Sequence, residues 1–155
     1  MLRRRILSSS LFFIGAALAA TACHDGRNDT RMQKTASSAT TFSEQYSAGQ
    51  ELFEANCAKC HGDSGQGSEK APRIVGLKEG ALPVEPPPER KFRKTRFVTV
   101  GDVADFVVHN MPPNKAGSLT DDEYWAILAF DLHANGIDLD HKLYAESART
   151  LTIPR

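Results

Sequence analysis

The run Cys57-Ala58-Lys59-Cys60-His61 brings two thiols and an imidazole within five positions of one another. Two thiols one helical turn apart can each form a thioether with a vinyl group of a haem, and the adjacent imidazole can then ligate the iron. A redox-active dithiol would need a βαβ setting, which the flanking sequence lacks. The motif therefore predicts one covalent haem c on Cys57 and Cys60, with His61 as an axial iron ligand.

A second axial ligand is expected in Met111-Pro112-Pro113. A proline keeps the residue before it extended, and two prolines stiffen the chain, so the Met111 thioether can be presented to the iron. His109 is the alternative, and a second imidazole would lower the reduction potential that a thioether raises. Met32 is a weaker candidate because it lies in a polar segment near the N-terminus.

The sequence offers no recognisable enzymatic site. It contains no nucleophile with a neighbouring base, no arranged pair of carboxylates and no convincing phosphate-binding loop. A haem with both axial positions filled transfers electrons rather than binding a substrate, so an electron carrier is expected and no catalytic residue is predicted. The enzymatic alternative is an open sixth position, at which the haem could bind gases or activate peroxide.

Three helices are predicted from threonine caps and apolar periodicity. The caps and approximate spans are Thr41 for 44–56, Thr99 for 100–110 and Thr120 for 121–134. The first span runs directly into the cysteine motif, and Asn135-Gly136 is a strong stop for the last. Residues 62–98 are rich in glycine and proline and are expected to form a long loop, as a chain that encloses a haem would.

Over residues 44–136 the chain resembles the class I cytochromes c. The resemblance implies an all-α fold of three main helices and long loops around one covalently bound haem. Gly49 and Phe53 stand where that family packs its first helix against its last, and the best-matching partners on the last helix are Ile127 and Phe130. A glycine at such a crossing lets the two backbones approach closely.

The resemblance also assigns roles around the haem. The loop containing Pro72 looks like the family loop in which a proline carbonyl accepts the second ring proton of the proximal histidine, here His61. Such a bond fixes the tautomer of the ligand and strengthens it. A simple turn proline is the alternative for Pro72. Met111-Pro112-Pro113 resembles the segment that carries the family's distal methionine ligand.

This resemblance predicts one-electron transfer outside the cytoplasm, with a periplasmic dehydrogenase or a terminal oxidase as redox partner. Residues 111–137 look similar to cytochrome modules that accompany sulfur-compound and alcohol dehydrogenases. A cytochrome subunit that accepts electrons from one such enzyme is therefore the alternative to a free carrier.

The first 22 residues have the features of an export signal. Arg3, Arg4 and Arg5 precede an uncharged apolar run from Ile6 to Ala20, and small residues follow it. An uncleaved anchor is the alternative, although the run is short for a membrane span. Removing the signal leaves 16 basic and 19 acidic residues, and this mildly acidic balance predicts no nucleic-acid partner.

Cys23 directly follows the predicted signal, so cleavage would make it the N-terminal residue, as in bacterial lipoproteins. Lipidation of Cys23 is expected, and it would place the protein at the periplasmic face of a membrane. Ordinary A-x-A cleavage, which would leave a soluble periplasmic protein with a free thiol, is the alternative.

Four parts are therefore predicted: a signal peptide over 1–22, a lipid-anchored flexible tether over 23–41, the cytochrome c domain over 42–136 and a C-terminal tail over 137–155 packed on it. The tether is polar and lacks aromatic residues, which predicts disorder. Such a chain of about 18 residues would reach roughly 20 to 25 Å. The basic run over 90–96 is expected to be a solvated loop, with docking on anionic headgroups or an acidic partner as the alternative.

Overall fold

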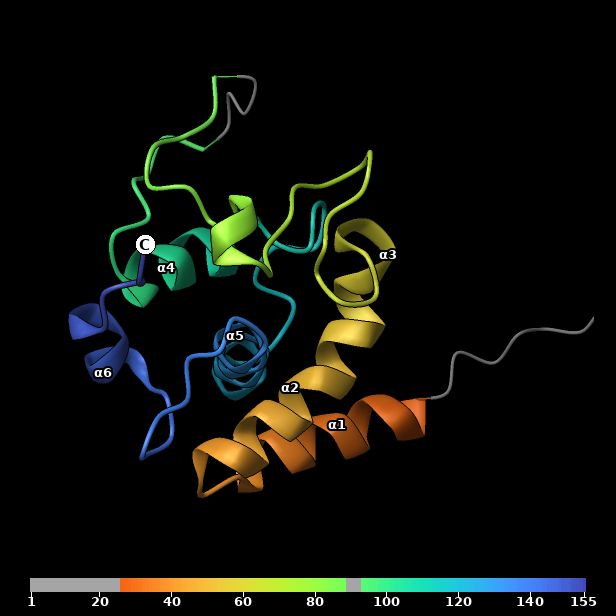
Figure 1. The fold of residues 1–155 in the computed structure, drawn as a ribbon. Coiled ribbons are helices and arrows are strands. Elements are labelled where there is room, and N and C mark those ends of the chain that lie inside the picture. Colours follow the sequence, from red (N-terminus) through yellow and green to blue (C-terminus); the bar gives the residue numbers. More distant parts are fainter. Residues whose placement is uncertain (1–25, 89–92) are drawn as a thin grey trace, which may run out of the picture.

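The computed structural model describes residues 26–88 and 93–155, and within them the regular structure is helical apart from an isolated bridge between Thr99 and Thr152 (Figure 1). The elements are α1 (Gly26–Ser38), α2 (Phe42–Asn56), α3 (Ala58–His61), the 3-10 helix η1 (Leu77–Glu79), α4 (Val100–Asn110), α5 (Asp121–Ala134) and α6 (Ala145–Thr150). The predicted signal peptide, Cys23 and residues 90–92 of the basic run lie outside the described residues.

The predicted all-α fold with three main helices is confirmed. Thr41, Thr99 and Thr120 are the N-caps of α2, α4 and α5, as expected, and each hydroxyl accepts a hydrogen bond from the backbone N–H three residues later. All three caps are complete capping boxes, because Glu44, Asp102 and Glu123 bond back to the cap residue. Each helix therefore has a start fixed by its own sequence.

The crossing of α2 and α5 is the main helix contact of the fold. An added Cβ at Gly49 would lie 1.8 Å from the backbone oxygen of Ala126, so only glycine permits this approach. About one helical turn further along α2, the ring centroids of Phe53 and Phe130 lie 5.0 Å apart. The crossing implied for Gly49 and Phe53 by the resemblance is thus present, and it places the end of α2, with its cysteine motif, against α5.

The flexible tether expected over residues 23–41 is wrong for Gly26–Ser38, which form the helix α1. This helix packs on both α2 and α5, Ala36 is fully buried and Ala39 is 7% exposed (Figure 1). Composition misled the prediction because small alanines provide little hydrophobicity of their own, yet they fit closely against an existing surface. Met32 is half-buried in the same helix and packs against a cluster that includes Cys57.

The C-terminal residues complete the core. Leu143, Ala148 and Ile153 are 0–3% exposed and pack with α4 and α5, and α6 lies against α4. Backbone bonds reinforce this contact: Val100 N donates to the carbonyl of Leu151 at 2.9 Å, and Ile153 N donates to that of Val98 at 3.0 Å. None of the helices in the described part of the chain is both long and apolar enough to cross a bilayer.

Candidate haem site

The cysteine motif forms a short helical turn at the end of α2. Cys57 lies at the junction between α2 and α3, and its backbone N–H still donates to the carbonyl of Phe53 at 2.8 Å. Cys60 N and His61 N both donate to the carbonyl of Cys57 at 3.0 Å. The two thiols are therefore held one turn apart, and both cysteines are free and half-buried.

His61 is oriented by the loop that follows it. Its Nδ1 lies 2.8 Å from the carbonyl oxygen of Pro72, which is the contact that the resemblance implies. With Nδ1 as the donor, Nε2 is the ring nitrogen left with a lone pair for a metal. The backbone carbonyl of His61 accepts from Gly67 N at 2.7 Å, which holds the loop to the motif a second time.

Two glycines allow this loop to fold tightly beneath the motif. Gly67 has φ +86°, and an added Cβ would lie 2.7 Å from the backbone nitrogen of Arg73. Gly65 has φ +69°, and its carbonyl accepts from both Ile74 N and Val75 N at 2.9 and 3.0 Å. These contacts bring Pro72 under His61 and direct the chain onward to η1.

Asn135 joins the same loop to the end of α5. Its side-chain Oδ1 accepts from Gly76 N at 2.8 Å, and its Nδ2 donates to the carbonyl of Ile74 at 3.0 Å and to that of Asp131 at 2.8 Å. The sequence marks Asn135 only as a helix stop, so this role was missed. An asparagine at a helix end satisfies nearby backbone groups in many proteins, and nothing in its local sequence indicates a distant partner.

Met111 follows α4 in extended conformation, with φ −122° and ψ 146°. Its backbone N–H donates to Val107, and its carbonyl accepts from the Tyr124 hydroxyl of α5 at 2.8 Å. The same hydroxyl accepts from Gly117 N at 3.0 Å, so Tyr124 holds both ends of the segment after α4. His109, the alternative ligand, is exposed, and its Nδ1 lies 2.7 Å from the carbonyl of Asp105 in its own helix.

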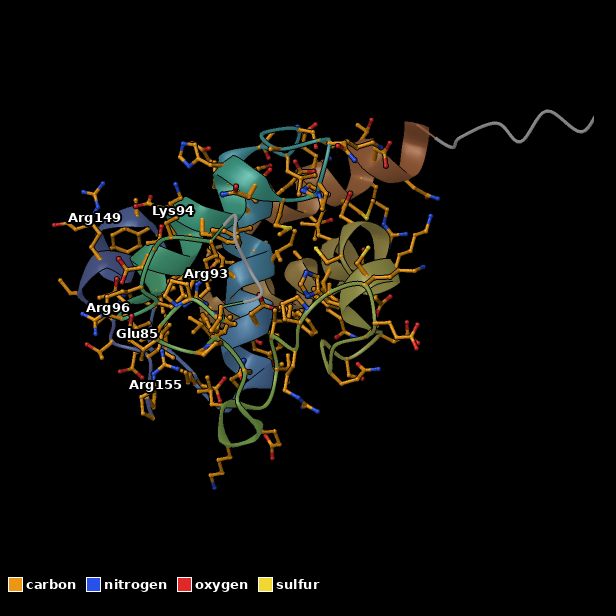
Figure 2. The ribbon with its side chains drawn as sticks, turned by 90° about the horizontal axis from the view of Figure 1, so that it is seen from above. Glu85, Arg93, Lys94, Arg96, Arg149 and Arg155 are labelled. Carbon is orange, nitrogen blue, oxygen red and sulfur yellow. The ribbon has the colours of Figure 1, made fainter. Side chains whose placement is uncertain are left out.

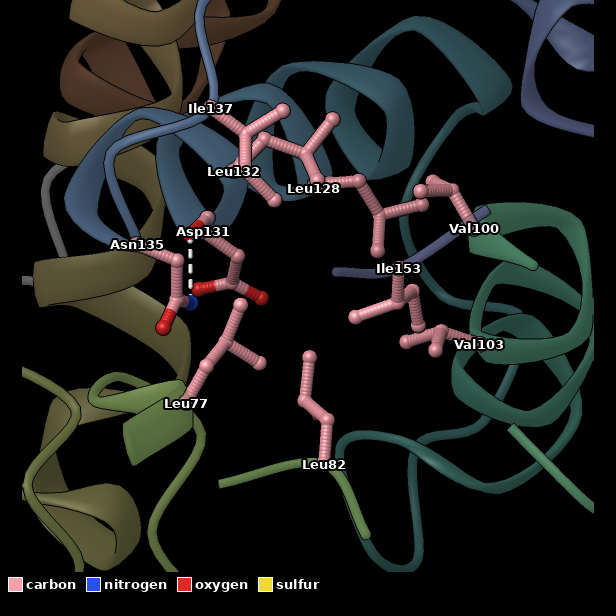
Figure 3. A pocket seen from close by; sticks show the side chains of 10 residues that line it. All are labelled: Leu77, Leu82, Val100, Val103, Leu128, Asp131, Leu132, Asn135, Ile137 and Ile153. Carbon is pink, nitrogen blue, oxygen red and sulfur yellow. Dashed lines mark hydrogen bonds between the residues drawn. The ribbon is translucent and has the colours of Figure 1, made fainter. Parts of the chain in front are cut away.

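An apolar pocket lies between the loop after His61 and the helix before Met111 (Figure 3). Eight aliphatic side chains line it, together with the carboxyl group of Asp131 and the amide of Asn135. The aliphatic residues are Leu77, Leu82, Val100, Val103, Leu128, Leu132, Ile137 and Ile153. This apolar lining suits the ring of a haem. Cys57, Cys60, His61 and Met111 do not line the pocket themselves, and they lie on the segments that precede η1 and follow α4.

The electrostatics of the cysteine motif agree with attachment rather than with dithiol redox chemistry. Burial raises the pKa of the Cys57 thiol to about 12, and the negative charges of Asp131 and Cys60 add to this effect. A reactive dithiol needs a lowered pKa, because the thiolate is the nucleophile. Cys57 has the opposite shift and remains a neutral thiol.

The expected solvated loop over 90–96 is wrong for Arg93, which is 7% exposed. Its guanidinium donates to the carbonyls of Pro83, Val84 and Thr95 and lies 3.7 Å above the Phe97 ring. Burial lowers the pKa of Arg93, and the positive charge of Arg155 lowers it further. The three carbonyl hydrogen bonds and the ring contact of the guanidinium offset the cost of burying its charge.

Figure 2 shows where the remaining cations of this region lie, on the side formed by α4, α6 and the C-terminus. Lys94 and Arg96 are exposed, and Arg96 pairs with Glu85 at 2.7 Å. Arg155 donates to the carbonyls of Leu82 and Phe97 at 2.7 and 2.6 Å. The basic residues therefore mainly hold the segment that carries Leu82 into the pocket.

Comparison with known proteins agrees with this geometry. A chain in the crystal structure of the sulfane dehydrogenase SoxCD from Paracoccus pantotrophus is 30% identical, with a TM-score of 0.50. The match covers 68% of this chain and 51% of that chain, so it spans about half of the relative's length. No curated protein matched. The family model of cytochrome c matches residues 46–133, more than half of the sequence, and includes the Cys57–Cys60 spacing that fits covalent haem c. The chain belongs to the cytochrome c family.

Proposed function

We propose that this cytochrome transfers single electrons in the periplasm, with His61 and Met111 as the two axial ligands of its haem iron. One observation carries the proposal: the segments that contain His61 and Met111 are each held by a hydrogen bond that does not use the atom proposed to bind the iron. Pro72 orients the His61 ring through Nδ1, and Tyr124 holds the Met111 backbone through its carbonyl. Neither of these two contacts uses Nε2 of His61 or the Met111 sulfur, the atoms proposed to bind the iron.

When bound, haem c supplies a one-electron Fe(II)/Fe(III) couple. The Pro72 carbonyl makes His61 a stronger and better-oriented donor, and a Met111 thioether favours the ferrous state. Pocket residues such as Leu128 and Val103 would exclude water from a haem ring held there, so that its surroundings would change little between the two oxidation states. Filled axial positions leave no place for a substrate, so outer-sphere electron transfer follows.

The ligand assignment can be tested with Met111→His and His109→Gln, compared with the unchanged protein. Met111→His should lower the midpoint potential and remove the weak long-wavelength band that thioether ligation gives ferric haem. His109→Gln should change neither. Loss of the band in His109→Gln, or its absence in the unchanged protein, would favour His109 as the ligand.

Carbon monoxide distinguishes the carrier from a haem enzyme with an open sixth site. The reduced protein should keep its spectrum after carbon monoxide is added, because the Met111 sulfur occupies the position. Prompt binding by the unchanged protein would support the enzymatic alternative.

A second candidate function is that of electron acceptor for a particular periplasmic dehydrogenase. The similarity to a chain of the sulfane dehydrogenase SoxCD favours an enzyme that oxidises sulfur compounds. The test is stopped-flow reduction of the purified ferric cytochrome by a catalytic amount of a sulfur-compound dehydrogenase supplied with its sulfur substrate and, in parallel, of an alcohol dehydrogenase supplied with its alcohol, the substrates being the source of electrons. Fast reduction by one enzyme alone supports a dedicated acceptor, whereas equal rates support a general carrier.

Attachment to the membrane through acylated Cys23 is a further part of the proposal. Cys23 precedes the first residue of α1 by three positions. Membrane fractionation with intact-mass measurement tests it: the unchanged protein should sediment and carry lipid mass, and Cys23→Ser should not. A soluble unchanged protein with an unmodified N-terminal Cys23 would contradict the anchor.

A further inference from the structure

Asp131 is the one acidic side chain among the ten residues that line the pocket, and it points into it from α5 (Figure 3). The residue is 8% exposed, and its Oδ1 has no hydrogen-bond partner among the described residues. A buried carboxylate without a partner is strongly disfavoured. Leu128, one turn earlier, and the adjacent Leu132 are aliphatic, and the Asn135 amide one turn later bonds to the backbone of Gly76, Ile74 and Asp131. No cation in the lining therefore balances a negative charge on Asp131.

The position of Asp131 relates it to the haem. The pocket borders the loop that orients His61 and also α4, which leads to Met111. Ile127, one helical turn before Asp131 on α5, belongs to the cluster against which Cys57 packs, so Asp131 lies near a haem attachment point. A haem fixed to Cys57 and extending into this pocket would have the Asp131 carboxyl beside it.

Burial raises the pKa of Asp131 to about 8, from an ordinary value of 3.8. Near neutral pH the carboxyl is then protonated in much of the population and is able to release its proton. Reduction of the iron adds one negative charge to the haem, and a nearby negative charge raises the pKa of an acid further. Oxidation has the opposite effect, so the charge on the iron and the proton on the carboxyl influence each other.

We infer that Asp131 is a redox-linked proton site, which binds a proton from solvent when the haem is reduced and releases it when the haem is oxidised. In the reducing direction one electron from the donor protein converts Fe(III) to Fe(II), and one proton converts the Asp131 carboxylate to the carboxylic acid. The electron leaves to the acceptor and the proton to solvent in the reverse direction. This inference rests on the proposed electron-transfer function and on haem occupying this pocket.

Other titratable groups on the surrounding elements do not take this place. Asp102 on α4 is bonded at the helix cap. The other titratable groups nearest in sequence to the lining residues are exposed: Lys78 and Glu79 on η1, Asp105 and His109 on α4, His133 and Asp138 near the end of α5, and Arg155 at the C-terminus. Cys57 and Cys60 do not line the pocket, and as haem thioethers they would not titrate. The haem propionates are a second source of pH dependence in the midpoint potential, and the test must separate their effect from that of Asp131.

The test is a spectroscopic redox titration of the haem-loaded protein between pH 4 and pH 10, with Asp131→Asn and, as control, Asp105→Asn. Asp105 is an exposed acid on α4, which also borders the pocket. In the unchanged protein and in the control the midpoint potential should fall as pH rises, with a slope that approaches one proton per electron. Asp131→Asn should lose most of that slope and keep only what the propionates contribute.

A redox-difference infrared spectrum provides a second measurement, whose carboxyl band is observed in the unchanged protein and assigned with the variants. Reduction should produce the C=O stretch of a protonated carboxyl that shifts in D₂O, and Asp131→Asn should lack it. Asp131→Glu, which retains a titrating group, should restore both signals at a displaced pH. An equal slope in Asp131→Asn and the unchanged protein, or a pH-independent potential in the latter, would overturn the inference while leaving the cytochrome function intact. Failure of the proposed function would instead appear as absence of covalent haem.

Discussion

The side-chain amide of Gln45 exchanges two hydrogen bonds with the backbone of Leu143, 98 residues further along the chain. Gln45 Nε2 donates to the carbonyl of Leu143 at 2.9 Å, and Leu143 N donates to Gln45 Oε1 at 2.8 Å. Both residues are completely buried. A polar side chain of α2 thus provides hydrogen-bond partners for the backbone of the C-terminal tail, and the tail in turn supplies Ile153 to the lining of the apolar pocket.

Gln45→Ala should destabilise the protein by about 2–4 kcal/mol, because it leaves two buried backbone groups of Leu143 without partners. Chemical denaturation of the haem-loaded protein measures the effect. Gln50→Ala is the control, since Gln50 is exposed on the same helix, and it should change stability by less than about 0.5 kcal/mol. Equal effects of the two substitutions would contradict the structural role of Gln45.

Gly49→Ala should disrupt the crossing of α2 and α5. The added methyl group would lie 1.8 Å from the oxygen of Ala126, which is backbone and cannot move without shifting the helix. Overpacking of this kind costs about 1–3 kcal/mol or more. The measurement is the yield of covalent haem and the thermal midpoint, with Ser47→Ala on the exposed face as control. A stable, fully loaded Gly49→Ala protein would show that the crossing is looser than described.

Tyr124→Phe should loosen the distal side while leaving haem attachment unchanged. The substitution removes the hydroxyl that donates to the Met111 carbonyl and accepts from Gly117 N. We expect the reduced variant to bind carbon monoxide faster than the unchanged protein, and its thioether band to weaken as pH rises. Tyr144→Phe, at an exposed tyrosine, should behave like the unchanged protein. Identical carbon monoxide kinetics in all three proteins would argue against this role.

Stability should fall as pH rises from about 4 to about 8. Burial raises the pKa of Asp131 to about 8 from 3.8, so the folded state retains a proton that the unfolded chain gives up in this interval. The stabilisation that comes from the Asp131 proton is fully present below pH 4 and is lost as the pH rises through the folded-state pKa. It amounts to a free energy of unfolding on the order of a few kcal/mol. Unfolding of the ferric haem-loaded protein at several pH values measures it, and Asp131→Asn should flatten the dependence.

Two other carboxyls act in a separate pH range. Hydrogen bonds at the helix caps lower the pKa of Glu44 and that of Asp102, so their contribution is present above their unfolded values and is lost on further acidification. A stability profile that rises steadily from pH 4 to pH 8 would contradict the assignment to Asp131.

Local signals predicted much of this fold because they act within one turn of helix. The threonine caps of α2, α4 and α5 and the spacing of the cysteine motif depend on residues three or four positions apart, and all are present in the structure. The contact of Pro72 with His61 was accessible only through the family resemblance, since eleven positions separate the two residues.

Features that depend on distant partners were missed or misjudged. Arg93 reads as one cation in a basic run, and only the carbonyls of Pro83 and Val84 make it a buried structural residue. Asp131 lies in a helix that is apolar on several sides, so helical periodicity does not reveal which face an acid takes. Residues 26–38 depend on α2 and α5 for their order, and their own composition does not reveal it.

If Cys23 is acylated as proposed, the packing of α1 on α2 and α5 would set the distance of the haem domain from the membrane. Gly26 lies three positions after Cys23, an extended length of roughly 10 Å, compared with more than twice that for a free tether of the whole segment. A domain held so closely would search for partners by lateral diffusion in two dimensions, at a nearly constant height above the lipid. Electron transfer would then select membrane-associated partners whose redox centres lie at that same height, in place of partners met freely in the periplasmic volume.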